Sequence, residues 1–229
     1  MIKIVTGNIF TTKCQTIVNT VNCVGVMGAG IAYECRLLYP IMYERYVELC
    51  KEKKLNIGML WIYKAEDKWI MNFPTKYHWK YESKEEYLEK GLQKLLETYK
   101  EKGLTSIAFP LLGASNGGIP EEVSLKIMKK YLEKCDIDIE IYHYDSLAYD
   151  DKFLKFKELW NEIPEKELAK ESGLRIDFVR KVKDAINNDR IRSLSRLLTV
   201  KGIGDVTLEK SFRFINSYND NKQNQLKFD

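Results

Sequence analysis

Residues 18–32 read VNTVNCVGVMGAGIA, and this stretch decides the fold. Its apolar, β-branched start predicts a strand, its glycines predict a tight turn, and the residues after Ala29 predict the opening of a helix. Gly25, Gly28 and Gly30 let the backbone approach a ligand without a Cβ in the way. The helix N-terminus offers unpaired N–H groups and a partial positive charge. The stretch therefore predicts a pyrophosphate site; the simpler interpretation is an ordinary strand-to-helix turn.

Residues 106–120 repeat the pattern as SIAFPLLGASNGGIP, again an apolar strand followed by a glycine-rich turn and a helix. Ser115 and Asn116 add side chains that can donate hydrogen bonds to diphosphate or ribose oxygens. The glycine spacing of the first turn is neither G-x-G-x-x-G nor that of a P-loop. Two such turns favour phosphate binding more strongly than one does, in a site unlike the common nucleotide-binding loops.

Strand-like and helix-like patterns alternate through residue 145. Strands are predicted at 2–5, 17–21, 58–63, 69–73, 105–109 and 138–143. Helices are predicted at 29–38, 40–53, 83–102 and 120–134. The alternation predicts an α/β fold with a mostly parallel sheet covered on both faces. In such sheets the ligand binds beyond the carboxyl ends of the strands, where both glycine-rich turns begin.

A third motif, NFPTKYHW at residues 72–79, lies between the two turns. Together NTVNCVGVMGAGIA, NFPTKYHW and PLLGASNGG resemble the macrodomain family, and within it the DarG branch of antitoxin glycohydrolases, which remove ADP-ribose from DNA. The resemblance implies a macrodomain over residues 1–146, a three-layer fold with a mostly parallel central sheet and helices on both faces. It also implies hydrolysis of the N-glycosidic bond between ADP-ribose and a nucleobase, reversing a DarT-type toxin.

The resemblance implies a set of ADP-ribose contacts at the end of the first strand and in both turns. These residues are Asn8, Ile9, Asn22, Val26, Gly28, Gly30, Ile31, Leu112, Gly113, Ser115, Asn116 and Gly117. By the same resemblance, the Asn22 amide contacts the distal ribose, whereas Asn19 is expected to be structural. From the residues alone, both asparagines are equally typical of strand ends that cap a turn.

Lys76 is the candidate catalytic residue. Low polarity in its aromatic-rich turn would lower the pKa of the amine and improve it as a nucleophile or proton carrier. A solvated surface lysine is the simpler interpretation; the resemblance favours catalysis, because the DarG-like branch has its catalytic lysine in this motif. Whether Lys76 attacks the anomeric carbon or only stabilises the opening sugar stays open. Tyr77, His78 and Trp79 are candidate DNA contacts through stacking or pairing, or packed residues.

Two departures from the family pattern bear on specificity. Asn8 stands where many macrodomains have an aspartate that accepts from the adenine amino group, so an amide oxygen without charge is left for that contact. The related terminal ADP-ribose glycohydrolases pair their lysine with an aspartate in the second turn, and Asn116-Gly117-Gly118 offers none. The second departure argues against a protein-glutamate substrate and suits the DNA-directed branch.

The C-terminal region has a different character. Residues 152–216 show helical periodicity and predict a small all-helical domain, and the polar residues 217–229 predict a frayed tail. Residues 165–184 have helix-turn-helix spacing, and Lys201-Gly202-Ile203-Gly204 resembles a helix-hairpin-helix turn, whose backbone N–H groups contact a DNA phosphate. Lys201, Gly202 and Gly204 are therefore candidate DNA contacts; a plain turn between packed helices, or toxin binding, are the alternatives. Residues 1–150 carry 20 basic and 20 acidic side chains and residues 151–229 carry 17 and 13, so the net charge of +4 lies in this region.

Composition narrows the class of protein further. The 229 residues include five scattered cysteines and two distant histidines, a pattern that favours neither a disulfide framework nor a metal site. We expect a cytoplasmic protein without a membrane span and without a cofactor, whose partners are ADP-ribose, ADP-ribosylated DNA and a DarT-type toxin. Two other functions stay open: a glycohydrolase for ADP-ribosylated protein or small ADP-ribose derivatives, and a non-catalytic ADP-ribose reader.

Overall fold

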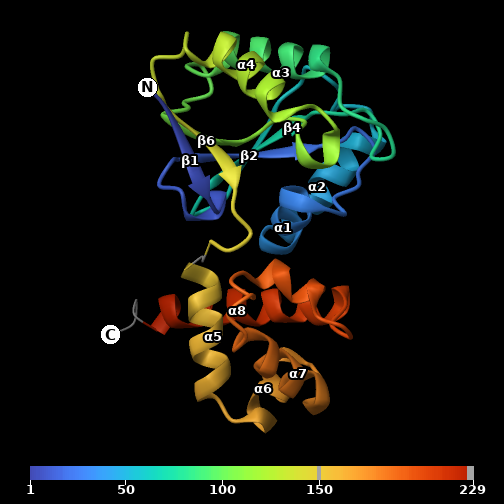
Figure 1. Cartoon of the computed structure of the whole chain (residues 1–229), viewed down its shortest axis with the longest axis vertical. Coiled ribbons are helices and arrows are strands. Elements are labelled where there is room, and N and C mark those ends of the chain that lie inside the picture. Colours follow the sequence, from blue (N-terminus) through green and yellow to red (C-terminus); the bar gives the residue numbers. More distant parts are fainter. Residues whose placement is uncertain (149–150, 226–229) are drawn as a thin grey trace. The chain divides into compact units, whose positions relative to one another are not determined.

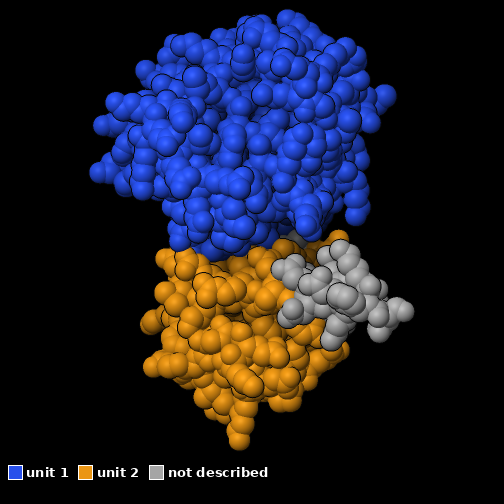
Figure 2. All heavy atoms as spheres, turned by 180° about the vertical axis from the view of Figure 1, so that it is seen from behind, with its two compact units in different colours: residues 1–144 blue, residues 145–229 orange. Residues whose placement is uncertain are grey.

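The structure, a computed structural model, describes residues 1–148 and 151–225, with side chains through Tyr218. The chain divides into two compact units, Met1–Tyr144 and Asp145–Asp229, which Figure 2 colours separately. The two units are described one at a time. Within the described residues, no helix is both long and apolar enough to cross a membrane.

A six-stranded sheet forms the centre of the first unit. Its strands are β1 (Ile2–Gly7), β2 (Thr16–Val21), β3 (Trp61–Lys64), β4 (Trp69–Pro74), β5 (Ser106–Pro110) and β6 (Asp138–Tyr144). The order across the sheet is β1-β6-β5-β2-β4-β3, and only the pairing of β3 with β4 is antiparallel. The sheet is therefore mostly parallel, as the alternation of strands and helices predicts.

Helices cover both faces of this sheet. They are α1 (Gly30–Leu38), α2 (Pro40–Lys51), α3 (Glu85–Thr98) and α4 (Glu121–Leu132). Figure 1 shows α3 and α4 on one face and α1 and α2 on the other. Each face has its own apolar core, with Leu88 and Met128 in the first and Met42 and Tyr46 in the second. The three-layer arrangement predicted from the sequence, a mostly parallel sheet with helices on both faces, is confirmed.

Two predicted boundaries are wrong for local reasons. The third strand begins at Trp61 rather than 58, because Gly58 has a φ of +81° and the N–H of Met59 donates to Asn56 O at 3.0 Å in a turn. The third helix ends at Thr98 rather than 102. The residues after Thr98 form a turn that ends at Gly103, whose φ of +73° is a left-handed conformation that favours glycine.

A buried pair of amides joins β2 and β4, two neighbouring strands of the sheet. Asn19 on β2 lies opposite Asn72 on β4, and both side chains are fully buried. Asn19 Nδ2 donates to Asn72 Oδ1 at 2.9 Å and makes a longer contact of 3.8 Å with Met27 Sδ. Asn19 Oδ1 and Asn72 Nδ2 have no partner among the described residues. Asn19 is thus a structural residue, as expected from the sequence.

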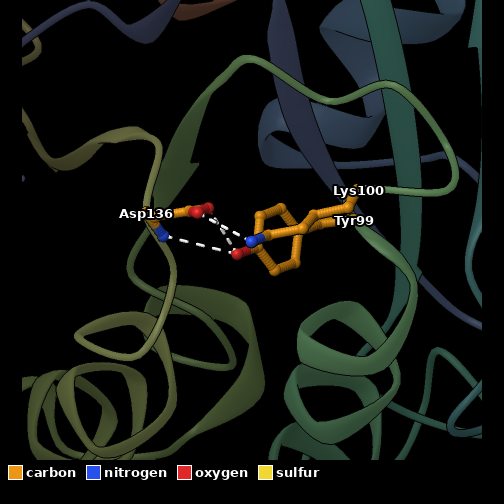
Figure 3. Close-up of polar contacts among 3 residues, drawn as sticks. All are labelled: Tyr99, Lys100 and Asp136. Carbon is orange, nitrogen blue, oxygen red and sulfur yellow. Dashed lines mark hydrogen bonds and ion pairs between the residues drawn. The ribbon is translucent and has the colours of Figure 1, made fainter.

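The end of α3 is tied to the segment that leads into β6 (Figure 3). The Tyr99 hydroxyl donates to Asp136 Oδ1 at 2.5 Å, and the Lys100 amine contacts Asp136 Oδ2 at 2.7 Å. The hydrogen bond from Lys100, followed by that from Tyr99, lowers the pKa of the Asp136 carboxyl. The Asp136 carboxylate therefore stays charged in weak acid, and its contacts with Lys100 and Tyr99 are lost as the pH falls through this lowered pKa.

All regular elements in the described part of the second unit are helices. Its elements are α5 (Asp151–Glu162), α6 (Glu165–Ser172), α7 (Ile176–Ile186), the short 3-10 helix η3 (Leu194–Thr199) and α8 (Asp205–Gln225). Its core is aromatic: Trp160 stacks on Phe156 with ring centroids 4.5 Å apart and meets Phe214 edge-on at 5.3 Å. Trp160 Nε1 also donates to Val179 O at 3.1 Å, which ties α5 to α7.

Two expectations for this unit meet the structure directly. The predicted helix-turn-helix is formed by α6 and α7, with Gly173 at a φ of +67° between them and the Lys210 amine donating to its carbonyl oxygen at 2.5 Å. The helix α8 continues past residue 217 to Gln225, and the frayed tail expected over 217–229 stays a prediction. The rest of the predicted tail, 226–229, lies outside the described residues.

Candidate active site

Three segments of the first unit meet at one edge of the sheet. Loop one (residues 22–29) follows β2, the lysine turn (residues 75–84) follows β4, and loop two (residues 111–119) follows β5. Because β5, β2 and β4 are parallel neighbours, their carboxyl ends lie at the same edge. The topology therefore gathers motifs that are far apart in the sequence.

The Asn22 amide holds loop one together. Its Oδ1 accepts from Val24 N at 3.0 Å and from Val26 N at 3.3 Å, and its Nδ2 donates to Val26 O at 2.5 Å. The buried hydroxyl of Tyr46, from α2, donates to Asn22 O and Oδ1 at 2.8 and 3.1 Å. The contact of Asn22 with a ribose stays a prediction. One hydrogen of Nδ2 is bonded to Val26 O, so the second hydrogen would have to make that contact.

The rest of loop one presents backbone rather than side chains. Gly25 and Gly30 have φ values of +80° and +56°, which favour glycine. A Cβ on Gly28 would meet only Val26, at 3.8 Å, so the space beside this backbone is open. Ala29 caps α1 without a side-chain hydrogen bond, which leaves the helix N-terminus available for an anion. Val26 is exposed and Ile31 is half-buried beside it.

Loop two is strained and tightly supported. Ser115 has a φ of +25°, unusual for a residue with a Cβ, and the N–H groups of Ser115 and Asn116 have no acceptor among the described residues. Gly113, at a φ of +65°, has no room for a side chain, since a Cβ would lie 2.9 Å from Ile119 Cδ1. Leu112 is fully buried, and its carbonyl oxygen accepts from Ser124 Oγ at 2.7 Å.

The three segments are in contact. The position of a Cβ on Gly30 lies 3.0 Å from Asn116 Nδ2, so the start of α1 meets loop two. The Lys76 amine donates to Asn116 O at 2.6 Å. Cys23 N donates to Tyr77 O at 2.9 Å, which fixes the lysine turn to loop one. The structure therefore places the candidate catalytic amine at the meeting point of both glycine-rich loops.

The surroundings of Lys76 act on its charge in opposite directions. Partial burial lowers the pKa of the amine, in the direction expected from the sequence, and the negative charge of Glu82 opposes this. Glu82 and Lys76 form no ion pair within the described part of the chain. The lysine is thus closer to its neutral, nucleophilic form than a solvated lysine is.

Two residues of the lysine turn support loop two and were missed by sequence reasoning. Ser83 N donates to Gly117 O at 2.8 Å, and its buried Oγ has no partner among the described residues. A Cβ on Gly117 would lie 2.6 Å from this Oγ. The Glu82 carboxylate lies against Gly118, 3.4 Å from where a Cβ would be. Neither residue stands in a recognisable motif, so only the packing of the two turns reveals them.

An exposed aromatic patch continues the lysine turn. We define it as Tyr77, His78, Trp79 and Tyr81; the three large rings are 55%, 50% and 68% exposed for Tyr77, Trp79 and Tyr81. His78 stacks on Trp79 with centroids 5.5 Å apart and lies 5.4 Å from the Tyr81 ring. The packed-residue alternative does not hold for Tyr77 and Trp79, since both rings face solvent.

The remaining predicted contacts do not belong to these three segments. Asn8 and Ile9 are buried at the end of β1, where Asn8 Oδ1 accepts from Phe10 N at 3.0 Å and starts a short 3-10 turn. Lys201, Gly202 and Gly204 belong to the second unit, in the turn between η3 and α8. The described part of the chain holds no cluster of three His, Cys, Asp or Glu side chains that could bind a metal ion.

Comparisons with known proteins agree with this fold and site. The family model described as Macro domain matches residues 18–128. The macrodomain of Thermus aquaticus DarG is 37% identical in sequence and superimposes with a TM-score of 0.60, over 62% of this chain and 98% of that one. The chain belongs to the macrodomain family.

Several of the relatives that match this chain belong to one branch of that family. A protein of Thermus aquaticus named DNA ADP-ribosyl glycohydrolase is 38% identical over 149 residues, which is 63% of this chain and 41% of the relative. Thermosipho africanus DarTG, solved in complex with ADP-ribose, matches at 31% identity and a TM-score of 0.60, over 78% of this chain and 46% of that one. This chain spans about two fifths of the length of the curated DarG-type relatives it matches.

Proposed function

We propose that this macrodomain hydrolyses the N-glycosidic bond between ADP-ribose and a nucleobase in DNA, as the antitoxin of a DarT-type ADP-ribosyltransferase. The observation that carries the proposal is the Lys76 amine at Asn116, where loop one, loop two and the lysine turn meet. Similarity to named DNA ADP-ribosyl glycohydrolases supports the choice of reaction.

The two loops bind the ligand in this proposal. The diphosphate takes the unpaired N–H groups of loop two and the uncapped N-terminus of α1, which together offer donors without a metal ion. The adenine lies towards Asn8 and Ile9, which are buried after β1 at the start of the short 3-10 turn. The distal ribose then lies between Asn22 and Asn116, with its anomeric carbon beside Lys76.

Lys76 acts at that anomeric carbon. Hydrolysis breaks the bond from carbon to base nitrogen, the electron pair leaves with the nitrogen, and water supplies the hydroxyl to carbon and a proton to the base. A neutral Lys76 amine, which the lowered pKa favours, provides electron density to the opening sugar, and the Asn116 carbonyl oxygen orients the amine. To reach the sugar, the amine must exchange its hydrogen bond to Asn116 O for contact with substrate.

The aromatic patch distinguishes a DNA substrate from a small one. Exposed rings beside a reacting base provide stacking surfaces for its neighbours, and each stacked base contributes about 1–3 kcal/mol. Tyr77 and Trp79 supply this platform in the proposal, and Tyr81 extends it. The absence of an aspartate in loop two fits a base leaving group better than a protein ester.

A toxin of the DarT type is the proposed protein partner, and the cytoplasm the proposed location. A relative from Thermosipho africanus is named as a fusion of DNA ADP-ribosyl transferase and DNA ADP-ribosyl glycohydrolase. All five cysteines are buried and unpaired, which supports a reducing compartment.

The test is release of free ADP-ribose from ADP-ribosylated single-stranded DNA by the full chain. We expect turnover by the wild type and loss of most turnover in Lys76→Ala, with affinity for free ADP-ribose kept within about tenfold, or about 1.4 kcal/mol. Lys94→Ala removes an exposed lysine of α3 that lies outside all three segments, so it serves as the charge-matched control and should react like the wild type.

Parallel reactions separate the competing functions. Release of ADP-ribose from modified protein but not from DNA would make the chain a protein-directed glycohydrolase. Tight ADP-ribose binding without turnover on either substrate, unaffected by Lys76→Ala, would make it a reader.

A further inference from the structure

The second unit contains a cavity lined by basic side chains. It lies between α7 and η3 and has a volume of about 520 Å³. Lys181, Arg190 and Arg196 line it together with a single carboxylate, Asp184. No ion pair involves any of these four side chains within the described residues, so the cavity carries an uncompensated positive charge.

Arg196 gives this cavity the character of an anion site. Its Nε is buried and has no hydrogen-bond acceptor among the residues that the structure describes. Buried donors are nearly always paired, so a cationic donor of this kind indicates a missing partner. Guanidinium groups bind phosphate oxygens with paired N–H donors, which makes phosphate the fitting chemistry.

The adjoining turn brings backbone to the same place. Ile203 N donates to Val200 O at 3.0 Å, and Gly202 has a φ of +85°, the glycine position of a type II turn. The position of a Cβ on Gly202 lies 2.6 Å from Lys181 Nζ, so the amine of α7 rests on this turn. Beside Gly204, whose surroundings are open, α8 begins.

We propose that this cavity binds a backbone phosphate of a nucleic-acid strand, with Arg196 and Lys181 as the charged contacts and the Lys201–Gly204 turn as the backbone contact. The phosphate chemistry rests on the cavity alone; the choice of DNA rests on the proposed function. Phosphate contacts of this kind position a strand without reading its sequence. The site lies outside the macrodomain and adds a strand contact to it.

Two other basic side chains close to this turn in the sequence bond to the protein's own backbone. Arg192 Nε donates to Asp189 O at 3.0 Å, and the Lys210 amine donates to Gly173 O at 2.5 Å. Lys181, which sequence reasoning did not single out, takes their place because α7 packs beside the turn.

The test measures binding of the full chain to unmodified, fluorescently labelled single-stranded DNA at several salt concentrations. The double variant Lys181→Gln, Arg196→Gln should bind more weakly, and the slope of log affinity against log salt should flatten by about 1.4 for two lost contacts. The matched control Lys166→Gln, Lys170→Gln removes two exposed charges from α6 and should keep the wild-type slope.

A gain-of-affinity variant guards against misfolding. Asp184→Asn removes the single carboxylate lining the cavity and should tighten DNA binding, most strongly at low salt. Arg196→Lys keeps the charge but loses the paired donors, so it should bind between the wild type and Arg196→Gln.

Two outcomes would overturn the proposal. One is equal affinity and slope in the double variant, in Asp184→Asn and in the wild type. The other is binding of inorganic phosphate at Arg196 by a chain that does not bind the oligonucleotide, which would make the cavity a small-anion site. Unmodified DNA carries no ADP-ribose, so neither outcome depends on the proposed glycohydrolase.

Discussion

At the level of single residues, the amine of Lys76 is subject to two opposing influences, partial burial and the charge of Glu82. An amine is neutral above its pKa and charged below it, so a lowered pKa moves the neutral form to lower pH. If neutral Lys76 acts on the sugar, kcat/KM should rise with pH and level off below the pH at which an ordinary lysine titrates.

Glu82→Gln sharpens this prediction. Glu82 raises the pKa of Lys76, so its removal should shift the rising limb of the pH profile to lower pH. Glu86→Gln, a similar change in the first turn of α3, should leave the limb in place. A rate that falls as the pH rises would show that the charged amine is the active form.

Asn22 is the second residue whose loss has a defined cost. Asn22→Ala removes the acceptor of two loop-one N–H groups and one of the two acceptors of the buried Tyr46 hydroxyl, and should destabilise the first unit by about 2–3 kcal/mol. Tyr46→Phe removes one hydroxyl and should cost about 1 kcal/mol. Thermal unfolding checks both, and calorimetry with ADP-ribose should show weaker binding in Asn22→Ala. Equal stability of Asn22→Ala and wild type would contradict the role of this amide in loop one.

Among the elements, α3 depends on a glycine in its middle. Alanine is the better helix former by about 1 kcal/mol, so Gly91→Ala would stabilise an exposed helix. Here a Cβ on Gly91 would lie 2.2 Å from Phe73 Cζ, in the fully buried core between α3 and β4. We expect Gly91→Ala to destabilise the first unit by about 1–3 kcal/mol in chemical denaturation. The double variant Gly91→Ala, Phe73→Leu should recover part of the loss; a stabilised Gly91→Ala would contradict the close contact.

The sequence predicts elements well where periodicity is strong and turns are marked by glycine. The six strands and four helices of the first unit fall within a few residues of their predicted places, since each has an apolar pattern of its own. The predictions that fail concern the ends of elements. A turn at Gly58 delays the start of β3, and α3 ends at Thr98, before the predicted residue 102.

Only some residues of the candidate site can be predicted from the sequence. The glycine loops and Lys76 stand in motifs, so the sequence predicts them, although their ligand contacts stay predictions. Glu82, Ser83 and Tyr46 stand in no motif; they act because the lysine turn packs on loop two and α2 packs under loop one. Contacts between distant segments have no local signal, and the cavity around Arg196 was missed for the same reason.

For the whole molecule, the division into two compact units predicts two unfolding events. Trp160 is fully buried between Phe156 and Phe214, and Trp160→Ala should destabilise the second unit by about 3–5 kcal/mol. In calorimetric scans of the full chain, this variant should lower the unfolding temperature of the second unit and leave that of the first unit unchanged. ADP-ribose at 100 times its dissociation constant should raise only the free energy of unfolding of the first unit, by about 2.7 kcal/mol. A single cooperative transition that shifts as a whole would show that the units unfold together.

The buried amides of Asn19 and Asn72 also bear on how the chain assembles. Side chains on both faces of β2 and β4 are buried, so burial alone does not distinguish the observed register from one shifted by two residues, which keeps every side chain on the same face of the sheet. That shift would place Asn72 opposite Ile17 or Val21 and bury both amides without a partner. It would also move Lys76 by about 6.6 Å along the strand direction, away from loop two. The hydrogen bond between Asn19 and Asn72 thus selects the register of β4 against β2. The position of the Lys76 amine along the strand direction therefore depends on two buried side chains.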